Sequence, residues 1–150
     1  MDQMSDIRST YSVHLAELLS EPPYEVREVG QWHQRILEGL PFEAVEKVKA
    51  RASLTDAEIA PLLGIGEATL RRARASGATL DSTTSDRLYR LSKAIAVAEE
   101  VLESAGSAIS WLRRSQPGLG GHVPLELLVT QAGADQVETL LRRIDYGVYT

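Results

Sequence analysis

The sequence predicts an all-α protein, and three observations support this fold class. Apolar residues recur at steps of three and four, the spacing of one buried helix face, along nearly all of the 150 residues. No alternation of apolar and polar residues continues long enough to predict a strand, and only the short apolar run 125–130 imitates one. Prolines and glycines gather between the periodic segments, where helices end. The chain is therefore expected to be a set of helices joined by turns.

Residues 1–39 are expected to form a helical N-terminal extension. A first amphipathic helix begins near Ile7 and ends before Pro22, because proline disfavours helical geometry at the residue that precedes it. A second helix carries the apolar residues around Trp32 and closes near Gly39. Each helix would bury one apolar stripe against the rest of the chain.

Residues 40–81 are expected to form a helix-turn-helix domain. A helix over 42–52 comes first, and Thr55 with Glu58 then has the spacing of a capping box, in which both side chains satisfy amides at a helix start. Gly64 stands where the turn between two such helices needs a positive φ. The residues expected to pack inside the unit are Ala60, Ile65, Leu70 and Ala73.

The second helix of this unit carries residue types that contact DNA phosphates and guanine edges. Two features oppose that function. Pro61 falls inside the first helix, where it costs about 3 kcal/mol unless the helix kinks or shifts its register. The first turn of the second helix, residues 66–68, offers no donor that reads bases. The residues expected to point outward and bind DNA are Thr69, Arg71, Arg72 and Arg74.

The distribution of charge agrees with DNA contact in this region. The whole chain has a net charge of -5, whereas residues 41–80 hold six bases against five acids. A nucleic-acid-binding protein concentrates positive charge where phosphates lie, so residues 41–80 are the expected place for such contact. The alternative is a helix-turn-helix that serves only as a scaffold or a dimer surface.

Residues 82–150 are expected to form a second small helical domain. A long helix over 86–103 carries one apolar stripe, and Glu99 and Glu100 are expected on its solvated flank. A loop rich in glycine and proline follows the Trp111-Leu112 pair, and a last amphipathic helix reaches almost to the end of the chain. Apolar anchors, turn glycines and terminal tyrosines are the composition of a surface that binds another protein.

Several functions are excluded by what the sequence lacks. Without cysteine there is no disulfide, no thiolate metal site and no cysteine nucleophile. His14, His33 and His122 have no carboxylates at ligand spacing, so neither a metal nor another cofactor is expected, and no catalytic residues are expected either. The start of the chain has no signal peptide, and no apolar stretch reaches the roughly 18 residues of a membrane helix. We expect a cytoplasmic protein that is not an enzyme.

From about Leu40 to Thr150 the sequence resembles the antitoxins of the Xre/MbcA/ParS family, the partners of RES-domain toxins. Four motifs carry the resemblance: GIGEATLRR, SDRLYRLSKAIAVAEEVL, the Trp111-Leu112 pair, and GLGGHVPLELLVTQAGADQVETLLRRIDYGVY. The last two are the most specific, because helix periodicity does not require the spacing of their Gly, Pro, Trp and Thr residues. Residues 1–39 fall outside the resemblance.

The resemblance implies an antitoxin of a type II toxin-antitoxin system. Its C-terminal domain would hold the terminal segment over the NAD-binding cleft of the toxin. Its helix-turn-helix would repress its own operon, as a homodimer within a larger toxin-antitoxin complex. The toxin-binding domain would be built on Trp111, Leu112, Leu119, Pro124, Leu125 and Leu128. The surface near the toxin cleft would consist of Arg142, Arg143, Asp145, Tyr146, Val148, Tyr149 and Thr150.

A second function remains open on the sequence. The chain could be a stand-alone helix-turn-helix regulator whose C-terminal domain oligomerises or senses a ligand. The block after Trp111 favours the antitoxin, because a plain dimerisation tail would not need that loop.

Overall fold

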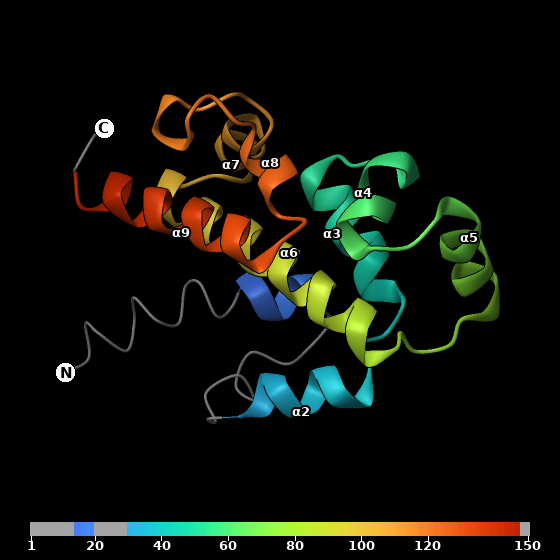
Figure 1. Ribbon diagram of the computed structural model, residues 1–150. Helices are drawn as coiled ribbons and strands as arrows, with labels where there is room; N and C mark the ends of the chain where they lie inside the picture. Colours follow the sequence, from blue (N-terminus) through green and yellow to red (C-terminus); the bar gives the residue numbers. More distant parts are fainter. Residues whose placement is uncertain (1–13, 20–29, 148–150) are drawn as a thin grey trace.

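The computed structural model describes residues 14–19 and 30–147, and these residues are helical without any strand (Figure 1). The predicted all-α fold class is confirmed. Residues 14–18 form a short helix. The helices that follow are α2 (Gln31–Glu38), α3 (Glu43–Ala52), α4 (Asp56–Leu63), α5 (Glu67–Ser76), α6 (Ser82–Leu102), α7 (Ala105–Leu112), η2 (Pro117–Leu119), α8 (Pro124–Leu127) and α9 (Gln131–Asp145).

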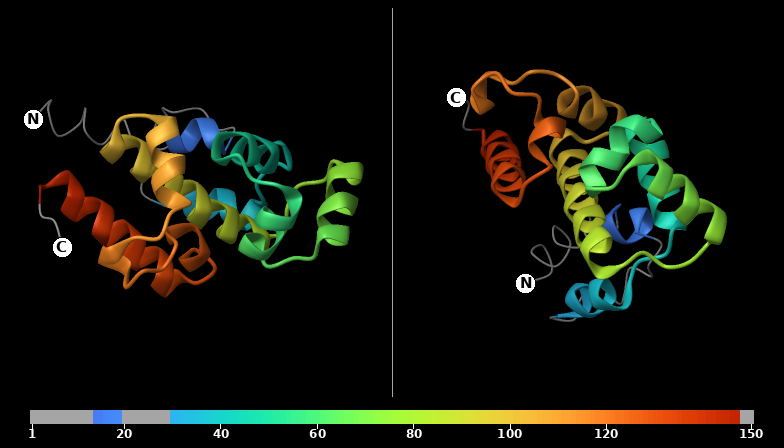
Figure 2. Two further views of the ribbon diagram at one scale, coloured as in Figure 1. Left: turned by 90° about the horizontal axis from the view of Figure 1, so that it is seen from above. Right: turned by 45° about the vertical axis from the view of Figure 1, so that its right-hand side comes forward.

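The long helix α6 is the axis around which the other helices pack. It contacts α2, α3, α4, α7 and α9, and Figure 2 shows these helices on different sides of it. Its predicted apolar stripe is buried at Leu88, Leu91 and Ile95. The helix begins earlier than expected because the Asp81 side chain accepts a hydrogen bond from the amide of Thr84 and caps it.

The helix-turn-helix forms as the local sequence predicts. Thr55 Oγ1 accepts from the amide of Glu58, and the Glu58 carboxylate accepts from the amide of Thr55, which completes the capping box. Gly64 ends α4 in the left-handed region at φ 71°. Pro61 lies inside α4 without interrupting it. The helix ends soon after Pro61. Proline has no amide hydrogen, so the carbonyl of Ala57 lacks its helical hydrogen bond, but Ala57 is exposed and water can bind this carbonyl instead.

Part of the N-terminal extension belongs to the core. Leu15, Ala16, Leu18 and Leu19 are each no more than 2% exposed. Further along, α2 packs on α6 through Trp32 and Tyr89, whose ring centroids lie 5.4 Å apart. The expected start of the first helix and its end before Pro22 lie outside the described residues, whereas the second helix, α2, begins at Gln31 and ends at Glu38, before Gly39 as expected.

The C-terminal helices pack against α6 through α7 and α9. The apolar run 125–130 contributes to α8 rather than to a strand. Thr130 caps α9 by accepting from the amide of Gly133, and Gly133 packs so closely on α8 that an added Cβ would lie 1.9 Å from the carbonyl oxygen of Leu127. No helix in the described part of the chain is both long and apolar enough to span a lipid bilayer.

The prediction that Glu99 faces solvent is wrong. Its side chain is only 1% exposed, and its carboxylate accepts from His14 Nδ1 at 2.7 Å while Arg51 Nε lies 3.5 Å away. The apolar stripe of α6 is wider than helix periodicity suggests, because residues 14–19 cover the flank on which Glu99 lies. This buried carboxylate joins the N-terminal extension, α3 and α6.

Candidate functional site

The outer face of α5 is the first candidate surface. Gly66 precedes the helix in extended geometry, so the first turn is placed as expected. Thr69, Arg71 and Arg72 are exposed on this helix. Arg72 Nη2 donates to Thr69 Oγ1 at 3.1 Å, which holds the two side chains together. Both guanidinium groups therefore stand at the surface of the second helix of the helix-turn-helix.

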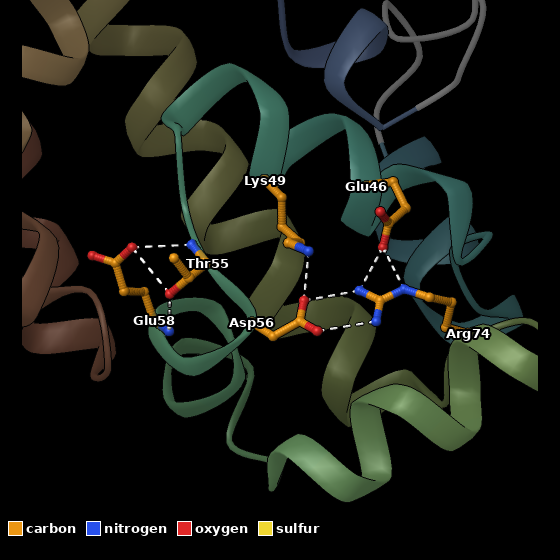
Figure 3. Close-up of polar contacts among 6 residues, drawn as sticks. All are labelled: Glu46, Lys49, Thr55, Asp56, Glu58 and Arg74. Atoms are coloured by element: carbon orange, nitrogen blue, oxygen red, sulfur yellow. Dashed lines mark hydrogen bonds and ion pairs between the residues drawn. The ribbon is translucent and has the colours of Figure 1, made fainter.

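The expectation that Arg74 points outward is wrong. Its guanidinium donates to Glu46 Oε1 at 2.8 and 3.0 Å and to both Asp56 carboxylate oxygens at 2.9 and 3.0 Å (Figure 3). The Phe42 ring lies under the same guanidinium at 5.6 Å. Hydrogen bonds from Arg74 first and Lys49 second hold the pKa of Asp56 well below its ordinary value. Arg74 therefore ties α5 to α3 and α4.

Ion pairs neutralise most of the positive charge that the sequence places in residues 41–80. Lys47 lies 3.5 Å from Glu43, and Lys49, Arg51 and Arg74 also contact carboxylates. Within the described residues, Arg71 and Arg72 are the bases of this segment that make no ion pair. The expected DNA-binding residues that stay exposed and outside ion pairs are therefore these two arginines and Thr69.

The outer end of α9 is the second candidate surface. Arg143, Asp145 and Tyr146 are exposed there, and Tyr146 is 80% exposed. Arg142 is half-buried, and its Nη1 lies 3.8 Å from Glu100 Oε2 on α6. Burial raises the pKa of Glu100, and the nearby Arg142 opposes that shift. The terminal residues Val148, Tyr149 and Thr150 lie outside the described part of the chain.

The two candidate surfaces lie at opposite ends of the molecule. In every view α5 occupies one end, and the last turn of α9 occupies the other (Figures 1 and 2). A partner on one surface would leave the other accessible.

Two sequence models of known families match this chain. Residues 31–93 match the "Antitoxin Xre-like helix-turn-helix domain", and residues 97–147 match the "Antitoxin Xre/MbcA/ParS C-terminal toxin-binding domain". The protein named Antitoxin Xre in Pseudomonas putida is 33% identical over 137 residues, which cover 91% of this chain and 84% of that protein. The chain belongs to the Xre family of antitoxins.

Two further relatives agree with this assignment. The Antitoxin Xre of Yersinia enterocolitica is 29% identical over 113 residues, which cover 75% of this chain and 76% of that protein. A protein of a Sphingobium species named Prs ADP-ribosylating antitoxin is 30% identical over 96 residues, covering 58% of this chain and 60% of that protein. The match to the helix-turn-helix model begins at residue 31, before Leu40, where the resemblance was expected to begin.

The antitoxin buries the residues on which its toxin-binding domain was expected to be built. They belong to the packed interior of this domain rather than to a contact surface, because little of their area reaches solvent. Leu119 is half-buried. The buried members are Trp111, Leu112, Pro124, Leu125 and Leu128.

The antitoxin also contains an important residue that sequence reasoning missed. Arg113, directly after the Trp111-Leu112 pair, reaches from the C-terminal domain to Glu58 at the start of α4, with Nη1 2.7 Å from Oε2. It also donates to the carbonyl of Ser53. No periodicity marks Arg113, because its partner is distant in the sequence and only the packed structure brings the two together.

Proposed function

We propose that this antitoxin neutralises a RES-domain, NAD-consuming toxin by holding its C-terminal segment, residues 142–150, over the active site of the toxin. The observation that carries the proposal is the exposure of Tyr146 at the end of α9, together with exposed Arg143 and Asp145 in the same last turn. Tyrosine and arginine are the side chains that dominate the binding energy of protein interfaces. A helix end already held by its own domain loses little further freedom when it binds.

The comparisons favour a partner of this class. The domain matched by residues 97–147 is described as toxin-binding, and it includes most of the proposed contact segment. The name of the Sphingobium relative mentions ADP-ribosylation, a reaction whose donor is NAD. We extend that chemistry to the toxin of this antitoxin as part of the proposal.

We further propose that α5 represses the operon of the antitoxin. Arg71 and Arg72 supply positive charge at the surface of the second helix, and Thr69 adds a hydroxyl beside them. Helix-turn-helix proteins usually read two half-sites as dimers, so the proposal includes a homodimer on the operator. Because α5 and the end of α9 lie far apart, DNA and toxin would occupy different ends of the antitoxin.

Co-expression with the toxin encoded beside this gene tests the proposal. The full-length antitoxin is expected to rescue growth, and deletion of residues 142–150 is expected to abolish rescue. Deletion of 146–150 leaves α9 whole and guards against a misfolded truncation. Deletion of residues 1–9, which lie far from α9 in the sequence, is the matched control and should still rescue.

The outcomes separate the parts of the proposal. If both C-terminal deletions still protect cells, the terminal segment does not cover the toxin's active site. If the full-length protein neither binds nor neutralises the neighbouring toxin, the choice of toxin is wrong.

A further inference from the structure

A hollow of about 560 Å³ runs beside the exposed flank of α9. Residues of the loop 118–122 line its other side, and Leu119 and Leu140 supply apolar lining. Thr139, Arg143 and His122 line the hollow as well. The hollow belongs entirely to the segment that matches the toxin-binding domain, residues 97–147.

The loop that forms one wall is held in place by its own hydrogen bonds. The amide of Gln116 donates to the carbonyl of His122 at 3.0 Å, and the amide of Gly121 donates back to the carbonyl of Gln116 at 3.0 Å. Ser115 Oγ donates to the carbonyl of Gly121 at 2.6 Å. The wall is therefore formed before any partner arrives, so a partner would not bear the cost of ordering it.

Among the described residues, no acid pairs with the positive charge at the Arg143 end of the hollow. Neither Arg143 nor His122 makes an ion pair or a side-chain hydrogen bond within the described residues. Asp135, the acid that lines the same hollow, lies two helical turns from Arg143, about 12 Å along the axis. Its Oδ1 already accepts from Gln131 Nε2 at 2.8 Å. The Arg143 guanidinium thus lines a preformed hollow without an internal ion-pair partner among the described residues.

We infer that this hollow receives an acidic side chain of the toxin, whose carboxylate is bound by Arg143. The inference rests on the proposed function, because it requires a toxin at the outer end of α9. An arginine binds a carboxylate through two parallel hydrogen bonds. The methylene groups of that glutamate or aspartate would lie on Leu119 and Leu140. The Thr139 hydroxyl would face the backbone or the side chain of the same toxin residue. Asp135, at the other end, favours a basic or polar neighbour in the same toxin segment.

The test measures binding of a catalytically inactive form of the toxin encoded beside this gene. Arg143→Gln is expected to weaken binding about tenfold or more and to flatten its dependence on salt. Arg143→Lys keeps the charge and should lose less, and Thr139→Tyr, which fills the hollow, should also weaken binding. Arg114→Gln is the matched control and should stay within about twofold, because Arg114 is an exposed arginine of the same domain that does not line the hollow.

Each of the following results would contradict either the inference or the proposed function. If full-length antitoxin binds tightly and Arg143→Gln binds equally well, the inference fails while the proposed function stands. If the toxin binds neither protein, the proposed function fails. If inorganic phosphate alone shifts the amide resonances of 118–122 at submillimolar concentration, the hollow is a small-anion site rather than a seat for a toxin side chain. Circular dichroism of every variant verifies folding.

Discussion

Arg113 and Glu58 join the two domains of the antitoxin through a bidentate ion pair. Nη1 lies 2.7 Å from Oε2, and Nη2 lies 3.1 Å from Oε1. The same carboxylate accepts from the amide of Thr55 at 3.0 Å and so caps α4. Arg113 chiefly, and the Thr55 amide second, lower the pKa of Glu58 to about 2. One carboxylate therefore starts a helix of the helix-turn-helix and anchors the toxin-binding domain to it.

Replacing Glu58 by glutamine should alter how stability depends on pH. The pKa of Glu58 is lowered from 4.5 to about 2 in the folded chain, so its ionised form contributes stability that is present above pH 4.5 and is lost as the pH falls toward 2. Glu58→Gln should cost about 1 kcal/mol at neutral pH, because the pair is partly exposed. It should also lose stability less steeply between about pH 5 and pH 2. Urea unfolding across this range measures both effects. Glu67→Gln, at an exposed position of α5, should leave the pH profile unchanged.

Removing the guanidinium that faces the buried carboxylate of Glu99 should be costly. Arg51→Met leaves this carboxylate with His14 alone, and because Arg51 is itself partly exposed the loss should be about 1 to 3 kcal/mol. The double variant Arg51→Met with Glu99→Gln should recover part of the loss, because no buried charge then remains. Lys47→Met on the same helix is the control. Equal unfolding free energies for Arg51→Met and Lys47→Met would show that Glu99 does not need the arginine.

Two glycines in the C-terminal domain should respond to alanine in opposite directions. In Gly133→Ala the new Cβ would meet the backbone carbonyl of Leu127, so α8 and α9 must separate at a cost of about 2 kcal/mol. In Gly106→Ala nothing lies within 4 Å, so the helix α7 should gain up to about 1 kcal/mol. Thermal unfolding of both variants measures these two changes in stability. A neutral Gly133→Ala would mean that the close approach of α8 and α9 relaxes freely.

The arginines of α5 should contribute unequally to DNA binding. Replacing Arg71 and Arg72 together by alanine should weaken binding to the promoter DNA upstream of the gene and lower its salt slope by about two. Arg74→Ala should leave the salt slope unchanged, because Glu46 and Asp56 already neutralise that arginine. Titrations at several salt concentrations compare the variants after their folding is verified. A slope reduced as much by Arg74→Ala as by the double variant would contradict this division, and an unaffected double variant would indicate a scaffold.

The cap and the turn of the helix-turn-helix were predictable because they depend on neighbours in the sequence. The Thr55 and Glu58 capping box and the left-handed Gly64 both involve interactions within a few residues. The burial of Trp111 and Leu128 followed from their apolar side chains and their place in the C-terminal motif. The energetic cost of Pro61 was harder to predict, because it depends on how soon α4 ends and on whether water reaches the carbonyl of Ala57.

By itself the sequence determined that the chain is helical, where its turns lie and to which family it belongs. The tertiary structure decided which of its charged side chains are paired or buried and which stay exposed. Arg74 and Glu99 were expected at the surface from helix periodicity, but carboxylates of α3 and α4 pair with the first, and residues 14–19 help to bury the second. Arg113 became a clamp between domains only because α4 lies beside it. Whether a charged side chain is free to bind a partner depends on contacts between residues far apart in the sequence, and local periodicity carries no information about them.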